Sequence, residues 1–169
     1  MKKIPTINYI KVLILCFVTV IVTLLLSNNY KRKIQYERSN RDVMSFLSTI
    51  KYEELENYLV ENHDGFIYMA SSCDATLESF EESLKNYMLD QELEKYFVYL
   101  DNSGYSDEMY TTLEKTFFVP ELSNQVVLSN RPNIFAIRDG KIIAVLYQEP
   151  TNITLEDVEK FVNVYEVIE

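Results

Sequence analysis

The sequence predicts an α/β fold in which a mixed β-sheet is packed against helices. Short apolar runs typical of buried strands alternate with segments whose apolar residues recur every three or four positions, which is typical of helices. The last two apolar runs, 133–138 and 141–147, are joined by Asp139-Gly140, a dipeptide that favours a tight two-residue hairpin turn. The alternation favours parallel strands joined by helices, and the hairpin adds an antiparallel strand.

Composition and charge indicate one acidic folded domain with a basic N-terminal appendage. The chain has 169 residues, of which 47% are hydrophobic, and this is enough to bury a core. Residues 1–41 carry a net charge of +7 and residues 42–169 a net charge of −17, within a total of −10. A body this acidic repels phosphate backbones, so we expect no nucleic-acid partner. Most of its acids are interpreted as a solvated surface.

An uncharged apolar stretch near the N-terminus predicts a transmembrane helix. Residues 12–26 carry no charge and would span about 22 Å as a helix. Flanking residues extend this to a plausible span, with Tyr9 and Tyr30 at the two membrane interfaces. A cleaved signal peptide is the alternative, but residues 27–30 offer no small-x-small cleavage site. We therefore expect a retained single-pass anchor in residues 1–30.

Basic residues flank both ends of this anchor, so its orientation is nearly tied by charge. An N-terminal Met-Lys-Lys followed by an apolar segment is typical of an exported chain, which favours a domain on the extracytoplasmic side of the cell membrane. The basic stretch 31–41 is expected to lie against anionic lipid headgroups. It continues into an amphipathic helix that starts at Ser39, which has capping-box spacing with Asp42. The apolar face of this helix holds Val43, Phe46, Leu47 and Ile50. Residues 31–50 are thus predicted to be a juxtamembrane segment.

From residue 51 onward the predicted elements form the domain itself, residues 51–169. A helix over 52–61 comes first, then a strand at Phe66–Ala70 and a helix with Leu77, Phe80, Leu84 and Tyr87 on its buried face. A strand at Phe97–Leu100, a helix over 107–118, the hairpin and a closing helix follow, and Thr154 and Asp157 have the spacing of a capping box at the start of that last helix. Val126–Leu128 is too short to assign.

Cys73 is the candidate nucleophile, and it is predicted to lie at the N-terminus of a helix. The unpaired N–H groups there carry partial positive charge and stabilise a thiolate. Asp74 and Glu78 oppose this effect with negative charge. The second cysteine, Cys16, lies in the apolar stretch, so the folded part cannot form an internal disulfide.

His63, the single histidine, lies in the turn-like sequence 62–65 and is expected to be exposed. As a general base it would have to lie close to the nucleophile. The carboxylates of residues 53–61 lack the spacing of metal ligands. We expect no metal and no cofactor.

Two landmarks make residues 50–168 resemble the thioredoxin-like superfamily. Residues 68–76, Tyr-Met-Ala-Ser-Ser-Cys-Asp-Ala-Thr, look like the strand-to-helix turn of that family, with Cys73 as the first cysteine of a C-x-x-C motif. Residues 131–141 look like its proline-opened hairpin, with Gly140 eight residues after Pro132. The chain looks similar to small membrane-tethered or secreted bacterial forms, including bacteriocin transport accessory proteins.

The resemblance implies a three-layer α/β/α domain and a cis peptide bond before Pro132, facing Cys73. The chain departs from the family pattern at Thr76, which stands where the resolving cysteine would be, giving C-x-x-T. Ile67 stands six residues before Cys73, where many active members carry a buried acid. A dithiol cycle within one molecule needs two thiols and is excluded.

Three interpretations of Cys73 are open. In the first, the chain is a membrane-tethered accessory or binding protein without dithiol activity, and the surface near Cys73 and Pro132 binds an extended peptide of a partner in or near the membrane. In the second, Cys73 is a monothiol that forms mixed disulfides with clients, and Thr76 donates a hydrogen bond to the thiolate. In the third, Cys73 is a small buried hydrophobe. The first is the function that we predict from the sequence.

Arg131, directly before Pro132, is the remaining candidate binding residue. Its guanidinium would stabilise the Cys73 thiolate or contact a client carboxylate. The alternative is an ordinary ion pair with one of the many acids.

Overall fold

The structure is a computed structural model that describes residues 16–23, 42–123, 125–126, 128–129, 131–147 and 153–165. Its chain divides into two compact units, Met1–Ser39 and Asn40–Glu169. In the first unit, residues 16–23 are helical and expose the apolar side chains of Phe17, Val18, Val20, Ile21 and Val22. Within the described ranges, no helix has the length and apolar character needed to cross a membrane. Most of the predicted anchor lies outside those ranges.

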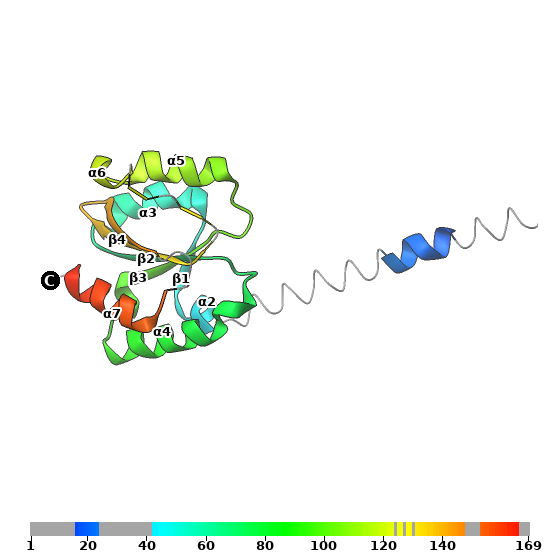
Figure 1. Cartoon of the computed structure of the whole chain (residues 1–169), viewed down its shortest axis with the longest axis horizontal. Helices are drawn as coiled ribbons and strands as arrows, with labels where there is room; N and C mark the ends of the chain where they lie inside the picture. The colour runs from blue at the N-terminus through cyan, green and yellow to red at the C-terminus, as the bar shows by residue number, and fades with distance from the viewer. Residues whose placement is uncertain are drawn as a thin grey trace, which may run out of the picture. The chain divides into compact units, whose positions relative to one another are not determined.

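The second unit is built on a sheet with the strand order β1-β3-β2-β4-β5 (Figure 1). The strands are β1 (Ser48–Ile50), β2 (Gly65–Ala70), β3 (Phe97–Asp101), β4 (Asn133–Arg138) and β5 (Lys141–Leu146). β3 pairs in parallel with both β1 and β2, whereas β4 is antiparallel to β2 and to β5. The predicted mixed sheet is confirmed.

Helices cover both faces of this sheet and give three layers (Figure 1). One face carries α2 (Asp42–Phe46), α4 (Glu78–Asp90) and α7 (Leu155–Val164), and the other carries α3 (Leu55–Glu61), α5 (Asp107–Phe117) and α6 (Pro120–Ser123). Because successive side chains of a strand point to opposite faces, each strand contributes to two cores. Phe66 and Tyr68 of β2 pack toward α4, and Ile67 and Met69 pack toward α3 and α5.

Strong local patterns place most elements as the sequence predicts. The hairpin turn has positive φ at both Asp139 (52°) and Gly140 (69°), as a mirror-image two-residue turn requires. The predicted capping box of α7 is present, since Thr154 and Asp157 exchange backbone and side-chain hydrogen bonds. The inward residues predicted for this helix are found facing the core: Leu84 of α4 and Leu77, just before α4, are buried, and Phe80 and Tyr87 are partly buried and pack against them.

The predicted helix through Ile50 is wrong, because residues 48–50 form strand β1. Ser48 pairs with Val98 and Ile50 pairs with Leu100 across a parallel ladder, and this tertiary pairing overrides the helical spacing of the sequence. Val43 and Leu47 are buried in the core, so α2 and β1 belong to the folded unit. Ser39, the predicted cap, lies outside the described residues.

Candidate functional site

Cys73 lies in the turn that follows β2, and its side chain is exposed. Asp74 is the N-cap of a short 3-10 helix, Ala75–Leu77, and α4 begins only at Glu78. Cys73 therefore precedes the helical turns, which corrects the prediction that it occupies a helix N-terminus. The exposure also makes the third interpretation, a buried hydrophobe, wrong.

Thr76 makes its hydrogen bonds to the Asp74 carboxylate. Its backbone N–H donates to Asp74 Oδ1 at 2.9 Å, and its hydroxyl donates to the same oxygen at 2.6 Å. A hydroxyl has a single proton to donate. The hydrogen bond from Thr76 to a Cys73 thiolate, expected for a monothiol, is therefore not made in this structure.

The carboxylate of Asp101, at the end of β3, holds the chain that leads to Cys73. Oδ1 accepts from the backbone N–H of Ser72 at 3.1 Å and of Ser103 at 2.9 Å. Oδ2 accepts from the Ser72 hydroxyl at 2.8 Å. Hydrogen bonds to a carboxylate are stronger than those between neutral groups. Asp101 thus fixes the turn after β2, a role that its place in a turn-like sequence did not indicate.

The strand register brings the two sequence landmarks to one end of the sheet. The antiparallel ladder between β2 and β4 ends at the pair Met69 and Asn133. The segments 70–73 and 131–132 therefore leave the ladder at the same end. Pro132 is buried, and the Asn133 side-chain amide donates to the Arg131 carbonyl at 2.7 Å. A direct contact between Cys73 and Pro132, and the cis bond before Pro132, stay predictions.

Buried polar atoms without a hydrogen-bond partner gather at this same end. Within the described residues they are the side-chain amide nitrogen and oxygen of Asn102, the Tyr105 hydroxyl and one guanidinium nitrogen of Arg131. Asn102 is fully buried at 0% exposure. Each such group costs about 1–3 kcal/mol when it is left unsatisfied, so a cluster of them calls for an explanation. This one guanidinium nitrogen of Arg131 makes no hydrogen bond of an ion pair with any described residue.

The topology makes this end a natural binding position. The neighbouring strands β2 and β3 continue to helices on opposite faces of the sheet, α4 after β2 and α5 after β3 (Figure 1). Open α/β sheets bind ligands outside the carboxyl ends of their strands, at such a switch in direction. The segment with Cys73 and the segment 101–105 flank that position.

His63 lies at the opposite end of the sheet. It is exposed, as predicted, and its carbonyl accepts a hydrogen bond from Gly140 N–H at 3.0 Å in the hairpin turn. The structure therefore does not bring His63 to Cys73. Among the residues described, no group of three or more His, Cys, Asp or Glu side chains is placed to hold a metal ion.

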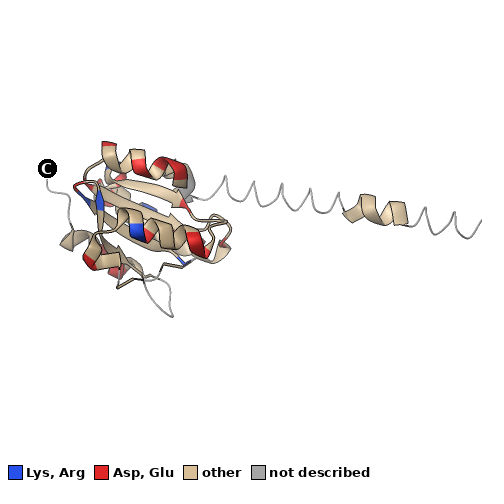
Figure 2. Ribbon diagram, turned by 90° about the horizontal axis from the view of Figure 1, so that it is seen from above, with Lys and Arg blue, Asp and Glu red and all other residues tan. Residues whose placement is uncertain are grey.

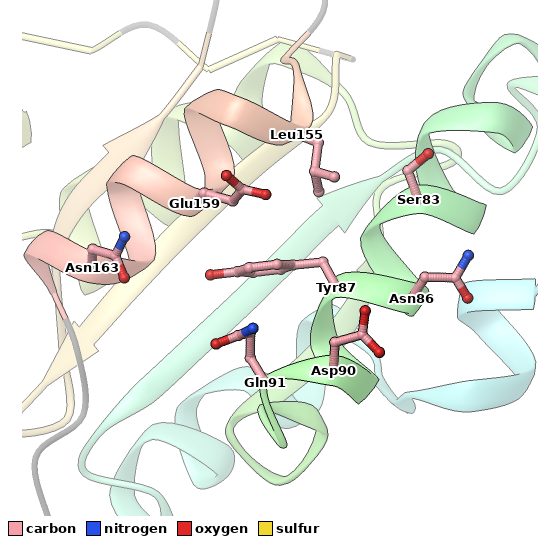
Figure 3. Close-up of a pocket in the computed structure, with 8 residues that line it drawn as sticks. All are labelled: Ser83, Asn86, Tyr87, Asp90, Gln91, Leu155, Glu159 and Asn163. Atoms are coloured by element: carbon pink, nitrogen blue, oxygen red, sulfur yellow. The ribbon is translucent and has the colours of Figure 1, made fainter.

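A cavity of about 570 Å³ lies between α4 and α7 on one sheet face. The Tyr87 ring projects between the two helices, with Asp90 on one side and Leu155 and Glu159 on the other (Figure 3). None of the site residues predicted from the sequence lines it. Acidic residues are spread over the helices of the folded unit, with few basic residues between them (Figure 2).

The chain is similar in structure to two solved thioredoxins. Thioredoxin f2 of Chlamydomonas reinhardtii is 13% identical with a TM-score of 0.49, over 73% of this chain and 99% of that one. Oxidised mitochondrial thioredoxin 3 of Saccharomyces cerevisiae is 13% identical with a TM-score of 0.45, over 70% and 94%. At this sequence identity and TM-score, neither structural similarity assigns an activity to this chain. No protein-family model and no curated protein matches the chain.

Proposed function

We propose that this chain is a membrane-tethered, thioredoxin-like accessory protein that binds an extended segment of a protein partner. The binding site is the end of the sheet at which the chain leaves β2 toward Cys73 and enters β4 from Pro132. The observation that carries the proposal is that buried polar atoms of Asn102, Tyr105 and Arg131, all at that end, have no hydrogen-bond partner among the described residues. These atoms are covered in the free chain, so the N–H and C=O groups of an extended peptide would satisfy them when the covering segments shift on binding.

The chemistry of the turn favours binding over a dithiol cycle. Cys73 is the single cysteine of residues 42–169, and Thr76 occupies the position of a resolving thiol. The Thr76 hydroxyl is engaged by Asp74. The Arg131 guanidinium is suited to a carbonyl or carboxylate of the partner, and one of its nitrogens, which is buried, has no hydrogen-bond partner among the described residues. Cys73 then serves as a small contact residue of the surface.

A monothiol exchange is the second candidate, and the exposure of Cys73 favours it. The Cys73 thiolate would attack a client disulfide, form a mixed disulfide and release the other client sulfur as a thiolate. A thiol of a second molecule would then attack the mixed disulfide and restore Cys73.

Tethering by residues 1–30 is part of the same proposal. Its support is the uncharged stretch 12–26 together with the exposed apolar side chains of the helical residues 16–23. The Thr23 hydroxyl donates to the Thr19 carbonyl at 2.8 Å, which satisfies this polar group within an apolar helix. Retention in the membrane pellet after alkaline carbonate extraction would support the tether, and release into the supernatant would contradict it.

Peptide selection tests the binding function. Displayed random peptides would be selected on the full-length chain in maltoside micelles, and hydrogen exchange would then be measured with a selected peptide bound. We expect added protection in Ser71–Cys73 and Arg131–Asn133. Protection confined to the surface between α4 and α7 would contradict the proposed site.

Insulin reduction by dithiothreitol separates the two candidates. The native chain and a Cys73→Ser variant would be compared at equal concentration. A binding protein without thiol chemistry gives the same rate for both. A rate increase that is lost in Cys73→Ser would favour thiol exchange and reject the first candidate.

A further inference from the structure

A second cavity, of about 340 Å³, adjoins the turn held by Asp101. It lies between the end of β1 with its following residues 51–53 and the loop 103–105 after β3. The rings of Tyr52 and Tyr105 line it at an interplanar angle of 88°, with their centroids 5.5 Å apart. Two rings at right angles form a corner, in which the edge of one ring meets the face of the other. A ring face that stays open at such a corner attracts cations, because it carries negative potential.

Charged side chains around the corner add to this attraction. Glu53, Asp101 and Lys51 are among the residues that line the cavity, so acids outnumber bases there. Burial raises the pKa of Tyr105 well above its usual range, and the nearby Tyr52, Asp101 and Glu53 raise it further. The field of both carboxylates thus reaches the tyrosine corner.

The chemistry of the lining residues indicates which cation fits. The Tyr105 hydroxyl is buried, so the ring of Tyr105 and not its oxygen is open to a ligand. A guanidinium presents five N–H donors on a flat, weakly hydrated group that also stacks on aromatic rings, and the carboxylates of Glu53 and Asp101 are acceptors. The acceptors and the ring faces suit arginine better than a more strongly hydrated ammonium.

We propose that this cavity binds a cationic side chain of the peptide partner, with arginine preferred over lysine. The inference rests on the proposed function in one respect, that the cation belongs to a peptide. Asp101 connects the turn that contains Cys73 with the cavity. Its carboxylate accepts hydrogen bonds from Ser72, which is next to Cys73, and Asp101 is also one of the residues that line the cavity. A peptide that passes Cys73 can therefore place a basic residue in the corner.

A short probe tests the cavity apart from strand addition. Acetyl-Gly-Arg-Gly-amide and its neutral citrulline counterpart would be titrated into full-length protein with ¹³C-labelled tyrosine, in neutral maltoside micelles. We expect the arginine probe to shift the Tyr52 and Tyr105 ring signals and to bind at least about threefold more tightly than the citrulline probe. The probe is too short to add a strand, so failure of the peptide-binding site would leave this result unchanged.

Three variants sharpen the test. Tyr52→Leu keeps apolar bulk without the π face, and Glu53→Gln removes an exposed charge, so each should weaken the arginine probe by about two- to fivefold. Lys51→Gln removes a like charge and should strengthen it. Tyr147→Leu removes an exposed tyrosine outside the cavity and should change nothing. Equal binding of the citrulline probe, or preferential binding of acetyl-Gly-Glu-Gly-amide through Lys51, would overturn the proposal.

Discussion

The two ends of the central sheet are held together in different ways. At the hairpin end the backbone closes on itself, since Gly140 N–H donates to the His63 carbonyl and an added Cβ at Gly140 would lie 2.8 Å from the Leu59 carbonyl oxygen. At the Cys73 end the Asp101 carboxylate holds the turn together with the hydrogen bond from Asp74 N–H to the Ser71 carbonyl, and some buried polar atoms have no partner among the described residues. The contacts at the hairpin end thus stabilise the fold. The unsatisfied buried atoms at the Cys73 end lower the free energy of unfolding, which is typical of functional surfaces.

The largest effect on stability is expected at the hairpin end. Gly140→Ala would place a Cβ against the Leu59 carbonyl in a residue with φ of 69°, and should lower the free energy of unfolding by about 2–3 kcal/mol. Urea unfolding of the full chain in maltoside would measure this. The iodoacetamide alkylation rate of native Cys73 should not change. A large change in that rate would show that the two ends are coupled, against this comparison.

The next largest effect is expected at Asp101. Asp101→Asn keeps one acceptor oxygen but loses the charge and the bond from the Ser72 hydroxyl, which should cost about 1–2 kcal/mol. The loosened turn should change the alkylation rate of Cys73 severalfold. Asp139→Asn is the matched control, because it removes an exposed carboxylate at the other end and Asn tolerates positive φ. An unaltered Cys73 rate in Asp101→Asn would refute the positioning role of Asp101.

Asn102 offers a change in the opposite direction. Asn102→Leu replaces two buried atoms without partners by apolar groups of similar size, and should raise the free energy of unfolding by about 1 kcal/mol. The same variant should bind selected peptides more weakly. A clear loss of stability would mean that Asn102 supports the fold itself and is not held in reserve for a ligand.

The smallest effect is expected at alkaline pH. Burial raises the pKa of Tyr105, and burial with the charge of Asp107 raises the pKa of Tyr110 to about 12. The unfolded chain loses these protons near pH 10 while the native chain keeps them, so stability is full below pH 10 and falls above it. Tyr105→Phe should make that fall shallower in urea unfolding between pH 9 and 11. Tyr147→Phe, at an exposed position, is the control, and an equal effect of both variants would contradict burial as the cause.

Local sequence signals predicted those parts of the fold that do not depend on distant partners. The Asp139-Gly140 turn and the Thr154 cap are specified by two to four residues, and both are found. Strand β1 could not be predicted in this way, because its three residues are a strand only through pairing with β3. The spacing of Val43 and Ile50 is that of a continuous helix, although Ile50 lies in strand β1.

The candidate site was predictable in its landmarks and not in its support. Cys73 and Pro132 are visible as motifs, and the register places the segments that carry them at one end of the sheet. The supporting role of Asp101 depends on its hydrogen bonds with Ser72, which lies 29 positions earlier in the chain. The residues around Asp101 indicated only the end of a strand. Helix α4 does not begin directly after Cys73, because the Asp74 side chain accepts a hydrogen bond from the Thr76 backbone N–H. This local hydrogen bond competes with the helix, and helical periodicity does not reveal it.

Photo-crosslinking from each end of the sheet tests the central claim most directly. A benzophenone maleimide would be attached to Cys73 in a full-length Cys16→Ser chain in native membranes. The control would carry it at position 60, in Cys16→Ser, Cys73→Ser and Val60→Cys combined, because Val60 is 69% exposed and lines a cavity with His63 and Gly140. We predict discrete protein adducts from Cys73 that a selected peptide suppresses, and none from position 60. Equal adducts from both positions, or adducts from position 60 alone, would contradict the assignment of the partner to the Cys73 end.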